Sequence, residues 1–290
     1  MTDGLREPVH IRPMTPGDVV PAEAVARSVL SVPGAPADGV SFGAAFARLV
    51  HLQRTDPGGA WVAEHDGEVA GLALALVRDG VWGLSLFAVA EPLQGRGVGR
   101  RLLERAWAHG EAQGARGHLI LSSTSPAAMR RYARLGLGLR PCVSAAGIVE
   151  RDRIPDVDGV VDAGAGGIEV ADAIGRAVRG AGHGRDLPVP LQGAGARLLL
   201  FEDRAFALVR GDRVSLLAGL DDEAATRVLW AAFAAFAPGA SVTVEFLTAG
   251  QDWAVRACLD AGLALSPDGP LFAGGELGPL RPYIPSGAYL

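Results

Sequence analysis

The chain has 290 residues, of which 49% are hydrophobic and 20% charged, an ordinary composition for a soluble globular protein with a substantial core. At roughly 100–200 residues per domain, this length indicates two domains. The net charge of −5 at pH 7 gives no electrostatic footprint for nucleic-acid binding. No apolar run approaches the roughly 20 residues of a membrane-spanning helix.

Lysine is missing from the sequence, so all 27 basic residues are arginine. Schiff-base chemistry and the phosphate-binding lysine of a P-loop are therefore excluded. Cys142 and Cys258 are too few for a disulfide framework or a CxxC metal site. With no recognisable signal peptide, we expect a cytoplasmic protein without a bound metal and without nucleic-acid or membrane partners.

The first half of the chain is expected to form an α/β domain ending near residue 152. Asp66-Gly67 and Asp79-Gly80 are hairpin signals between strands. The expected strands are 9–12, 61–64, 69–77, 81–89, 118–122 and 139–149. The expected helices are 19–30, 42–53, 98–113 and 126–135.

Residues 153–167 are rich in Asp, Gly, Pro and Ala with little periodicity, and we expect a linker there. This gives a first domain at 1–152 and a second at 168–290. The second is expected to contain helices 170–179, 223–236 and 252–260 and strands 197–201, 205–210, 214–217 and 242–247.

A glycine-rich turn follows the strand that ends at Val89 and precedes the helix that begins at Val98. Glycine lets the backbone approach a ligand closely, and the N–H groups at a helix N-terminus bind anions such as a pyrophosphate. A Rossmann fingerprint would need glycine where Arg100 stands and an acidic residue near Gly117, and a P-loop would need lysine.

Gln94-x-x-Gly97-x-Gly99 after a strand resembles the acetyl-CoA loop of the GNAT superfamily of N-acetyltransferases. Further along, Ser125-x-x-Ala128-x-x-x-Tyr132-x-x-x-Gly136-Leu137 is similar to the family's Asn-x-x-Ala-x-x-x-Tyr-x-x-x-Gly-Phe helix. In this chain Ser replaces Asn and Leu replaces Phe. The resemblance covers residues 8–150 and implies an acetyl-CoA-dependent N-acetyltransferase.

The resemblance also implies the roles of individual residues. The strand at Phe87–Val89 would splay from its neighbour and offer backbone groups to the pantetheine amides, and Ser125 would contact the same arm. Tyr132 would protonate the departing thiolate, a reaction that suits a phenol with a pKa near 10. The implied cofactor residues are Phe87, Ala88, Val89, Gln94, Gly95, Arg96, Gly97, Val98, Gly99, Arg100, Arg101 and Ser125.

A constant spacing of 126 residues relates the two halves. It places the helix motif over Gln251, Ala254, Cys258, Gly262 and Leu263, which indicates an internal duplication. The same spacing places the glycine turn over 220–225, which has no glycine and three carboxylates that would cap the helix and repel a pyrophosphate. The chain therefore resembles two tandem GNAT-like α/β domains, each a mixed sheet flanked by helices, of which the second no longer binds CoA. Cys258 is expected to be a buried residue that packs in the core rather than a nucleophile.

The predicted reaction is direct transfer of an acetyl group from acetyl-CoA to an amine of a small molecule or peptide. A general base is not evident on strand 81–89, and the nearby hairpin supplies Glu64, His65 and Glu68 as candidates. The alternatives are an acyl-CoA-binding regulator that does not turn over and a transferase of a longer acyl group. The sequence leaves open whether the protein forms a homodimer.

The last ten residues, 281–290, carry two prolines and two tyrosines, which is typical of a stiff segment that docks. They would either line the acceptor cleft of the first domain, through Tyr283, Tyr289 or Leu290, or pack on their own domain.

Overall fold

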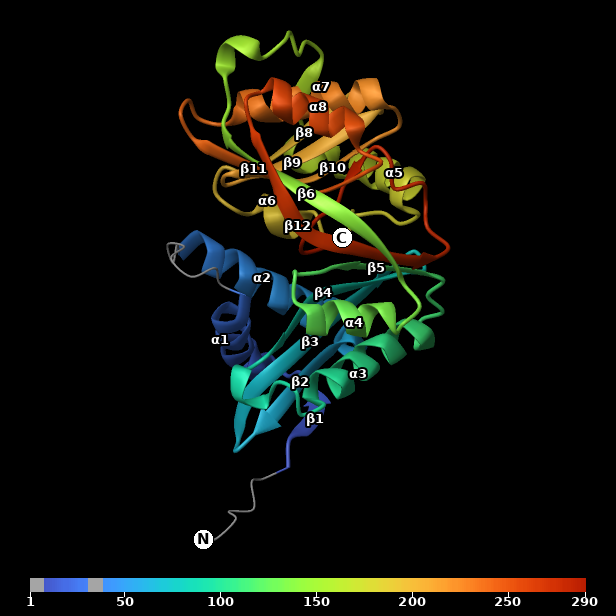
Figure 1. The fold of residues 1–290 in the computed structure, drawn as a ribbon. Helices are drawn as coiled ribbons and strands as arrows, with labels where there is room; N and C mark the ends of the chain where they lie inside the picture. Colours follow the sequence, from blue (N-terminus) through green and yellow to red (C-terminus); the bar gives the residue numbers. More distant parts are fainter. Residues whose placement is uncertain (1–7, 31–38) are drawn as a thin grey trace. The chain divides into compact units, whose positions relative to one another are not determined.

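The computed structural model describes residues 8–30 and 39–290. The chain packs as two compact units (Figure 1). The first contains the residues up to 77 together with 82–115, and the second contains 78–81 together with 116–290.

The first unit is a small sheet of four strands in the order β1-β2-β3-β4. Its elements are β1 His10–Pro13, α1 Val19–Leu30, α2 Gly39–Thr55, β2 Ala60–His65, β3 Glu68–Arg78, β4 Val81–Val89 and α3 Val98–Ala112, with short 3-10 turns at Pro16–Asp18, Pro57–Gly59 and Glu91–Leu93. β1 pairs with β2 and β2 with β3, both antiparallel. The expected strands and helices of this region are therefore confirmed.

Both predicted Asp-Gly hairpin turns are present. Asp66 and Gly67 have φ angles of 52° and 77°, and Asp79 and Gly80 have φ angles of 47° and 81°. A two-residue turn with both residues left-handed matches the twist of the flanking strands, which is why Asp-Gly is favoured there.

The core of the first unit fixes α3 against the sheet. β4 is buried along nearly its whole length, and the indole N–H of Trp82 donates to the carbonyl of Ala106 on α3 at 2.9 Å. Gly110, one turn later, lies so close to the Trp82 ring that an added Cβ would come within 2.6 Å of it. The start of β4 is thus fixed to the second half of α3.

The second unit holds a larger sheet in the order β5-β12-β6-β11-β10-β9-β8-β7, with β13 paired to β10. Its strands are β5 Gly117–Leu121, β6 Gly138–Ile148, β7 Val160–Asp162, β8 Arg197–Phe201, β9 Ala205–Arg210, β10 Arg213–Gly219, β11 Ser241–Thr248, β12 Ala264–Gly275 and β13 Tyr283–Ile284. Its helices are α4 Pro126–Ala133, α5 Ile168–Arg179, α6 Pro188–Leu191, α7 Asp222–Ala235 and α8 Asp252–Asp260, with 3-10 turns at Arg151–Arg153 and Gly164–Gly167.

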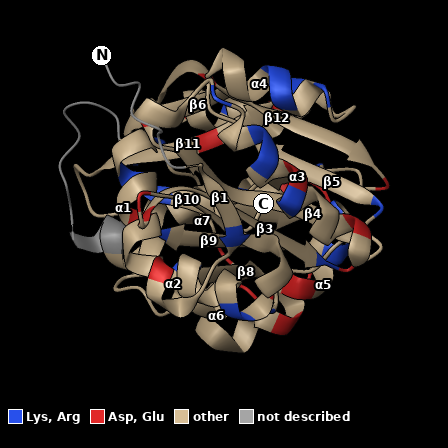
Figure 2. Cartoon of the chain, turned by 90° about the horizontal axis from the view of Figure 1, so that it is seen from below, with Lys and Arg blue, Asp and Glu red and all other residues tan. Residues whose placement is uncertain are grey.

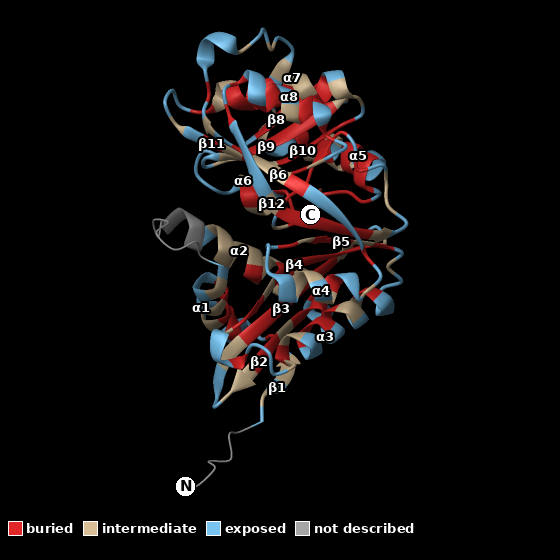
Figure 3. Cartoon of the chain, in the orientation of Figure 1, coloured by how far each residue is buried: buried red, intermediate tan, exposed pale blue. Residues whose placement is uncertain are grey.

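Alternate side chains of β9 and β10 enter two cores on opposite faces of this sheet. Leu208 and Leu216 belong to the core that contains α5, whereas Val209 and Leu217 belong to the core that contains α7 and α8. Figure 3 shows these strands and the inner sides of the helices as buried, while much of β6 and the beginning of β12 are exposed.

The two halves of the sequence exchange their last strands within the second unit. β6 belongs to the first half but lies between β11 and β12, antiparallel to both. β12 belongs to the second half but lies between β6 and β5, where Leu271 faces Leu121. β5 and β11 are therefore each completed by the last strand of the other half.

The same element order occurs twice along the chain. β2-β3-β4-α3-β5-α4-β6 in the first half is followed by β8-β9-β10-α7-β11-α8-β12 in the second. Arg101 on α3 donates to the carbonyl of Val9 at 2.9 Å, and Arg227, its counterpart at the spacing of 126, donates from α7 to the carbonyl of Asp158 at 3.1 Å. Each arginine thus fixes the backbone just before the first strand of its own half.

Some expectations about organisation differ from the structure. The compact units divide near residue 115 rather than 152, because β6 pairs with β11 and β12. The stretch expected to be a linker, residues 153–167, contains β7, an edge strand that pairs with β8. The sequence predicts no strand at 264–275, where β12 lies. The predicted domain bounds, 1–152 and 168–290, therefore differ from the bounds of the two compact units.

None of the helices in the described ranges, 8–30 and 39–290, combines the length and the apolar character needed to cross a membrane.

Candidate active site

The glycine-rich turn lies in the first unit, between the end of β4 and α3. Gly95 and Gly97 have φ angles of 75° and 81°, a backbone conformation that favours glycine. Gln94 donates from its side-chain amide to the carbonyl of Val89 at 2.9 Å, which fastens the turn to the end of β4. Gln94 is one of the predicted cofactor-binding residues, but its visible side-chain contact is with the backbone.

This turn leaves room for a ligand. An added Cβ at Gly95 or at Gly97 would meet nothing within 4 Å. The first backbone hydrogen bond of α3 runs from Arg101 N to Gly97 O. The N–H groups of Val98, Gly99 and Arg100 therefore come before the first intrahelical hydrogen bond and have no acceptor within the helix. Such N–H groups, at the positive end of the helix dipole, suit an anion.

The arginines around the turn differ in what they contact. Arg100 forms an exposed ion pair with Glu104 at 3.1 Å. Arg101 is engaged with the Val9 carbonyl, and because Arg227 makes the same contact in a half without a glycine turn, this contact belongs to the fold. Arg96 and Arg100 are thus the better candidates for a cofactor phosphate.

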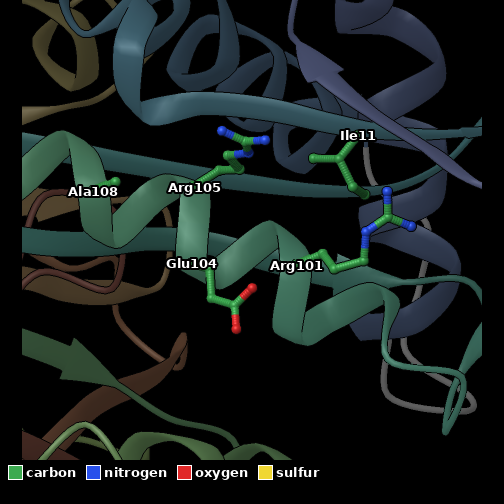
Figure 4. A pocket seen from close by; sticks show the side chains of 5 residues that line it. All are labelled: Ile11, Arg101, Glu104, Arg105 and Ala108. Atoms are coloured by element: carbon green, nitrogen blue, oxygen red, sulfur yellow. The ribbon is translucent and has the colours of Figure 1, made fainter.

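A shallow pocket of about 310 Å³ runs along the outer side of α3 (Figure 4). It is lined by Ile11, Arg101, Glu104, Arg105 and Ala108. The guanidinium of Arg105 lies over the Trp61 ring, 5.4 Å from its centroid. All three charged residues that line this pocket, Arg101, Glu104 and Arg105, are therefore already engaged with other groups of the protein, and the pocket does not coincide with the glycine turn.

The second sequence motif lies in the second unit, on α4. Ser125 is the N-cap residue of this helix, yet its hydroxyl makes no capping hydrogen bond, and it is exposed. Its side chain is therefore not used by the helix. Arg130 and Arg131 follow in the last turn of this helix. Figure 2 shows α4 with blue, positively charged segments.

Tyr132 projects from α4 into a largely apolar setting. It is 5% exposed, and its ring meets that of Phe272 edge to face, with centroids 5.5 Å apart and an interplanar angle of 72°. Burial raises the pKa of Tyr132 above its usual range, and the positive charge of Arg131 offsets part of this rise. The phenol thus keeps its proton at neutral pH, as an acid must before it acts.

Phe272, on β12, is a neighbour of Tyr132 that no sequence motif predicts. It is fully buried and faces Ile120 of β5 and Leu139 of β6. No motif marks it, and only the strand exchange brings it beside Tyr132.

The candidate bases lie at the end of the β2–β3 hairpin. This is also the end at which β4 enters the glycine turn, because Ala90 N donates to Ala70 O. Glu64 accepts from the Arg12 guanidinium at 2.7 Å, and His65 lies 3.5 Å from Asp66. Glu68 is exposed. The Glu64 contact is part of an ion-pair cluster that Arg12 also forms with Asp18.

The corresponding positions of the second half are built differently. The chain from β4 to α3 spans residues 90–97, whereas only residues 220–221 connect β10 to α7. Asp221 caps α7 by accepting from Ala224 N at 2.9 Å and pairs with Arg204. Burial raises the pKa of the Cys258 thiol to about 12, which fits the predicted packing role.

Residues 35–137 match the model of the Acetyltransferase (GNAT) family. Comparison with curated proteins finds no match to this sequence.

Solved structures share the fold over the whole chain. A Pyrococcus horikoshii protein described as a candidate acetyltransferase superposes with a TM-score of 0.80 at 19% identity, over 100% of this chain and 99% of its own. A GCN5-related N-acetyltransferase from Sphaerobacter thermophilus gives 0.56 at 16% identity, over 97% and 98%. Another from Kribbella flavida gives 0.59 at 15% identity, over 92% and 72%. At these identities the similarity shows the fold alone.

Proposed function

We propose that the protein transfers an acetyl group from acetyl-CoA to an amine of a small molecule or peptide, starting from the match of residues 35–137 to the model of the GNAT acetyltransferase family. The observation that carries the proposal is the glycine turn. It combines open space at Gly95 and Gly97 with N–H groups at the start of α3, which suits a pyrophosphate.

The second half supplies an internal contrast that supports this assignment. There the connection is short, and the Asp221 carboxylate already accepts from the first turn of α7. A carboxylate in that place competes with a phosphate for the same donors and repels it. The proposal therefore assigns acetyl-CoA to the first half.

When bound, acetyl-CoA supplies an activated thioester that a neutral amine can attack directly. In the proposed reaction the new N–C bond would form and the C–S bond would break, and Tyr132 would donate its phenolic proton to the leaving sulfur. The proton that the amine nitrogen loses would pass to solvent, and solvent would return a proton to the Tyr132 phenolate. The hydroxyl of Ser125, free of a capping bond, would hold the pantetheine arm. The backbone of Phe87, Ala88 and Val89 would pair with the amides of that arm.

The test is acetyl-CoA binding by isothermal titration calorimetry, with the native chain compared with Gly97→Glu. We expect micromolar binding by the native protein and at least a 100-fold loss in the variant. The physical reason is that a carboxylate about 4 Å from a phosphate charge costs roughly 4 kcal/mol at an effective dielectric constant of 20.

Gly239→Glu is the matched control. Gly239 is exposed, has a φ angle of 77° and has open space around its Cβ position, so this variant adds the same charge and a similar backbone strain away from the turn. The control should bind acetyl-CoA like the native protein. If the native chain binds none, the proposal fails; if it binds, a panel of amines would separate a transferase from a regulator that only binds acyl-CoA.

A further inference from the structure

The strands β10 and β11 of the second half run side by side over only part of their length. They pair in parallel at Arg213–Val214, opposite Thr243 and Val244. Beyond this point β10 continues to Gly219 without β11 as a partner. An opening between two parted strands exposes backbone donors and acceptors that an extended chain can satisfy by strand addition.

Residues of the tail occupy this opening. β13 pairs antiparallel with β10, with Leu217 opposite Ile284 and Ala218 opposite Tyr283, and it also contacts β11. Gly219 N donates to Pro282 O at 3.2 Å. The tail segment thus pairs with β10 at the residues that β11 does not reach.

The side chains of β13 alternate like those of a strand within the sheet. Ile284 is buried in the core that contains α7 and α8, and Tyr283 is buried in the core on the opposite face. The Tyr283 hydroxyl donates to Leu290 O at 2.6 Å and lies 3.2 Å from His183 Nε2. A segment lying across the surface of the sheet would bury only one of its two faces.

Gln251 holds the same segment from the α8 side. Its side chain is 2% exposed, donates to Leu280 O at 2.8 Å and accepts from Tyr283 N at 3.0 Å. Gln251 is the N-cap residue of α8, as Ser125 is of α4, and the spacing of 126 relates the two. One buried amide therefore binds both a carbonyl and an N–H of an extended chain.

From these contacts we propose that the opening between β10 and β11 is a binding site for an extended chain that carries amide groups, and that residues 280–284 of this protein fill it permanently. A peptide strand and the pantetheine arm of CoA both carry amide groups of this kind, and here the occupant is the peptide strand 280–284. It rests on the proposed function in one respect: with the second site filled, the chain binds a single acetyl-CoA.

Hydrogen–deuterium exchange of the full chain tests the occupant. We expect slow exchange at residues 280–284 in the native protein, and Gln251→Ala to speed it at least about tenfold, because the variant removes an acceptor and a donor from a buried backbone. Gln192→Ala, at an exposed glutamine of the same unit, should leave the exchange unchanged. Fast exchange of 280–284 in the native protein, or no effect of Gln251→Ala, would overturn the inference.

Calorimetry on the native chain is the second arm and needs no variant to fold. One acetyl-CoA per chain is expected, with the exchange at 280–284 unchanged when it is added. Two per chain, or displacement of the tail by acetyl-CoA, would overturn the inference. No binding at all would overturn the proposed function, while slow exchange at 280–284 in the same sample would still support the tail as occupant.

Discussion

At the scale of single residues, the candidate acid depends on a neighbour from the far end of the sequence. Tyr132 comes from the first half and Phe272 from the second, and their rings meet edge to face. This aromatic contact restricts the orientation of the phenol, and burial keeps it protonated. Tyr132 could be predicted from its motif, but Phe272 could not, because no local pattern distinguishes it from any other core phenylalanine.

Replacement of Tyr132 by Phe tests its role. We expect kcat to fall by about 100-fold or more, the usual contribution of a positioned acid, with acetyl-CoA affinity little changed because the ring is kept. Because burial raises the pKa of Tyr132 above its usual range, loss of its proton should not lower kcat of the native enzyme at any pH up to about 10. Steady-state kinetics from pH 6 to about 10.5 measures both, and an unchanged kcat in Tyr132→Phe would remove the residue from the mechanism.

At the scale of elements, the turn between β3 and β4 shows what a local pattern can and cannot reveal. Asp79-Gly80 predicts the hairpin, and its geometry is confirmed. The sequence does not reveal that residues 78–81 pack with the second unit. There Arg78 forms a bidentate ion pair with Asp186 at 2.7 and 2.9 Å, and Asp79 accepts from Gly182 N.

Breaking this ion pair should be costly. Arg78 and Asp186 are 6% and 1% exposed, so Asp186→Asn would remove a buried carboxylate charge that pairs with a buried guanidinium. Loss of one partner of a buried pair costs about 3–5 kcal/mol in the free energy of unfolding. Urea denaturation followed by circular dichroism would measure it.

Glu276→Gln is the comparison variant for that experiment. It breaks the Arg116–Glu276 pair, whose side chains are 70% and 76% exposed. Such surface pairs contribute less than about 1 kcal/mol. Equal effects of the two variants would mean that burial does not govern the Arg78–Asp186 pair.

The other elements could be predicted where local sequence determines them, and could not where distant strands hold them in place. Long periodic segments such as α3, and strands between clear turns such as β9, lie close to their predicted bounds. β7, with three residues, and β13, with two, are too short to give a pattern. β12 contains Pro267 and several glycines, which obscure the strand signal, and it is held by β5 and β6 on either side.

At the scale of the whole molecule, the strand exchange makes the two halves of the sequence interdependent. β5 and β6 of the first half find their partners in β12 and β11 of the second. The duplication itself could be predicted from the spacing of 126, because related segments keep related sequences. The strand exchange could not be predicted, because a strand that pairs within its own half and a strand that pairs with the other half have the same local sequence pattern.

A divided chain tests this interdependence. Residues 1–155 produced alone should fail to fold or should aggregate, because the edge of β5 that β12 covers would be open. A full chain with a protease site inserted after Pro155, which is exposed, should remain associated and keep its melting temperature after cleavage. Gel filtration and thermal denaturation distinguish the two cases. A stable, monomeric 1–155 fragment would contradict the expectation.

The exchange also sets a delay during synthesis. β5 ends at Leu121, and its partner β12 does not begin until Ala264. At about 5–20 residues per second, a ribosome takes roughly 7–30 s to reach that strand. Throughout this interval the nascent chain carries an uncovered strand edge and the apolar surface around Tyr132. We therefore expect cells that lack ribosome-associated chaperones to yield less soluble protein, even though the finished molecule is well packed.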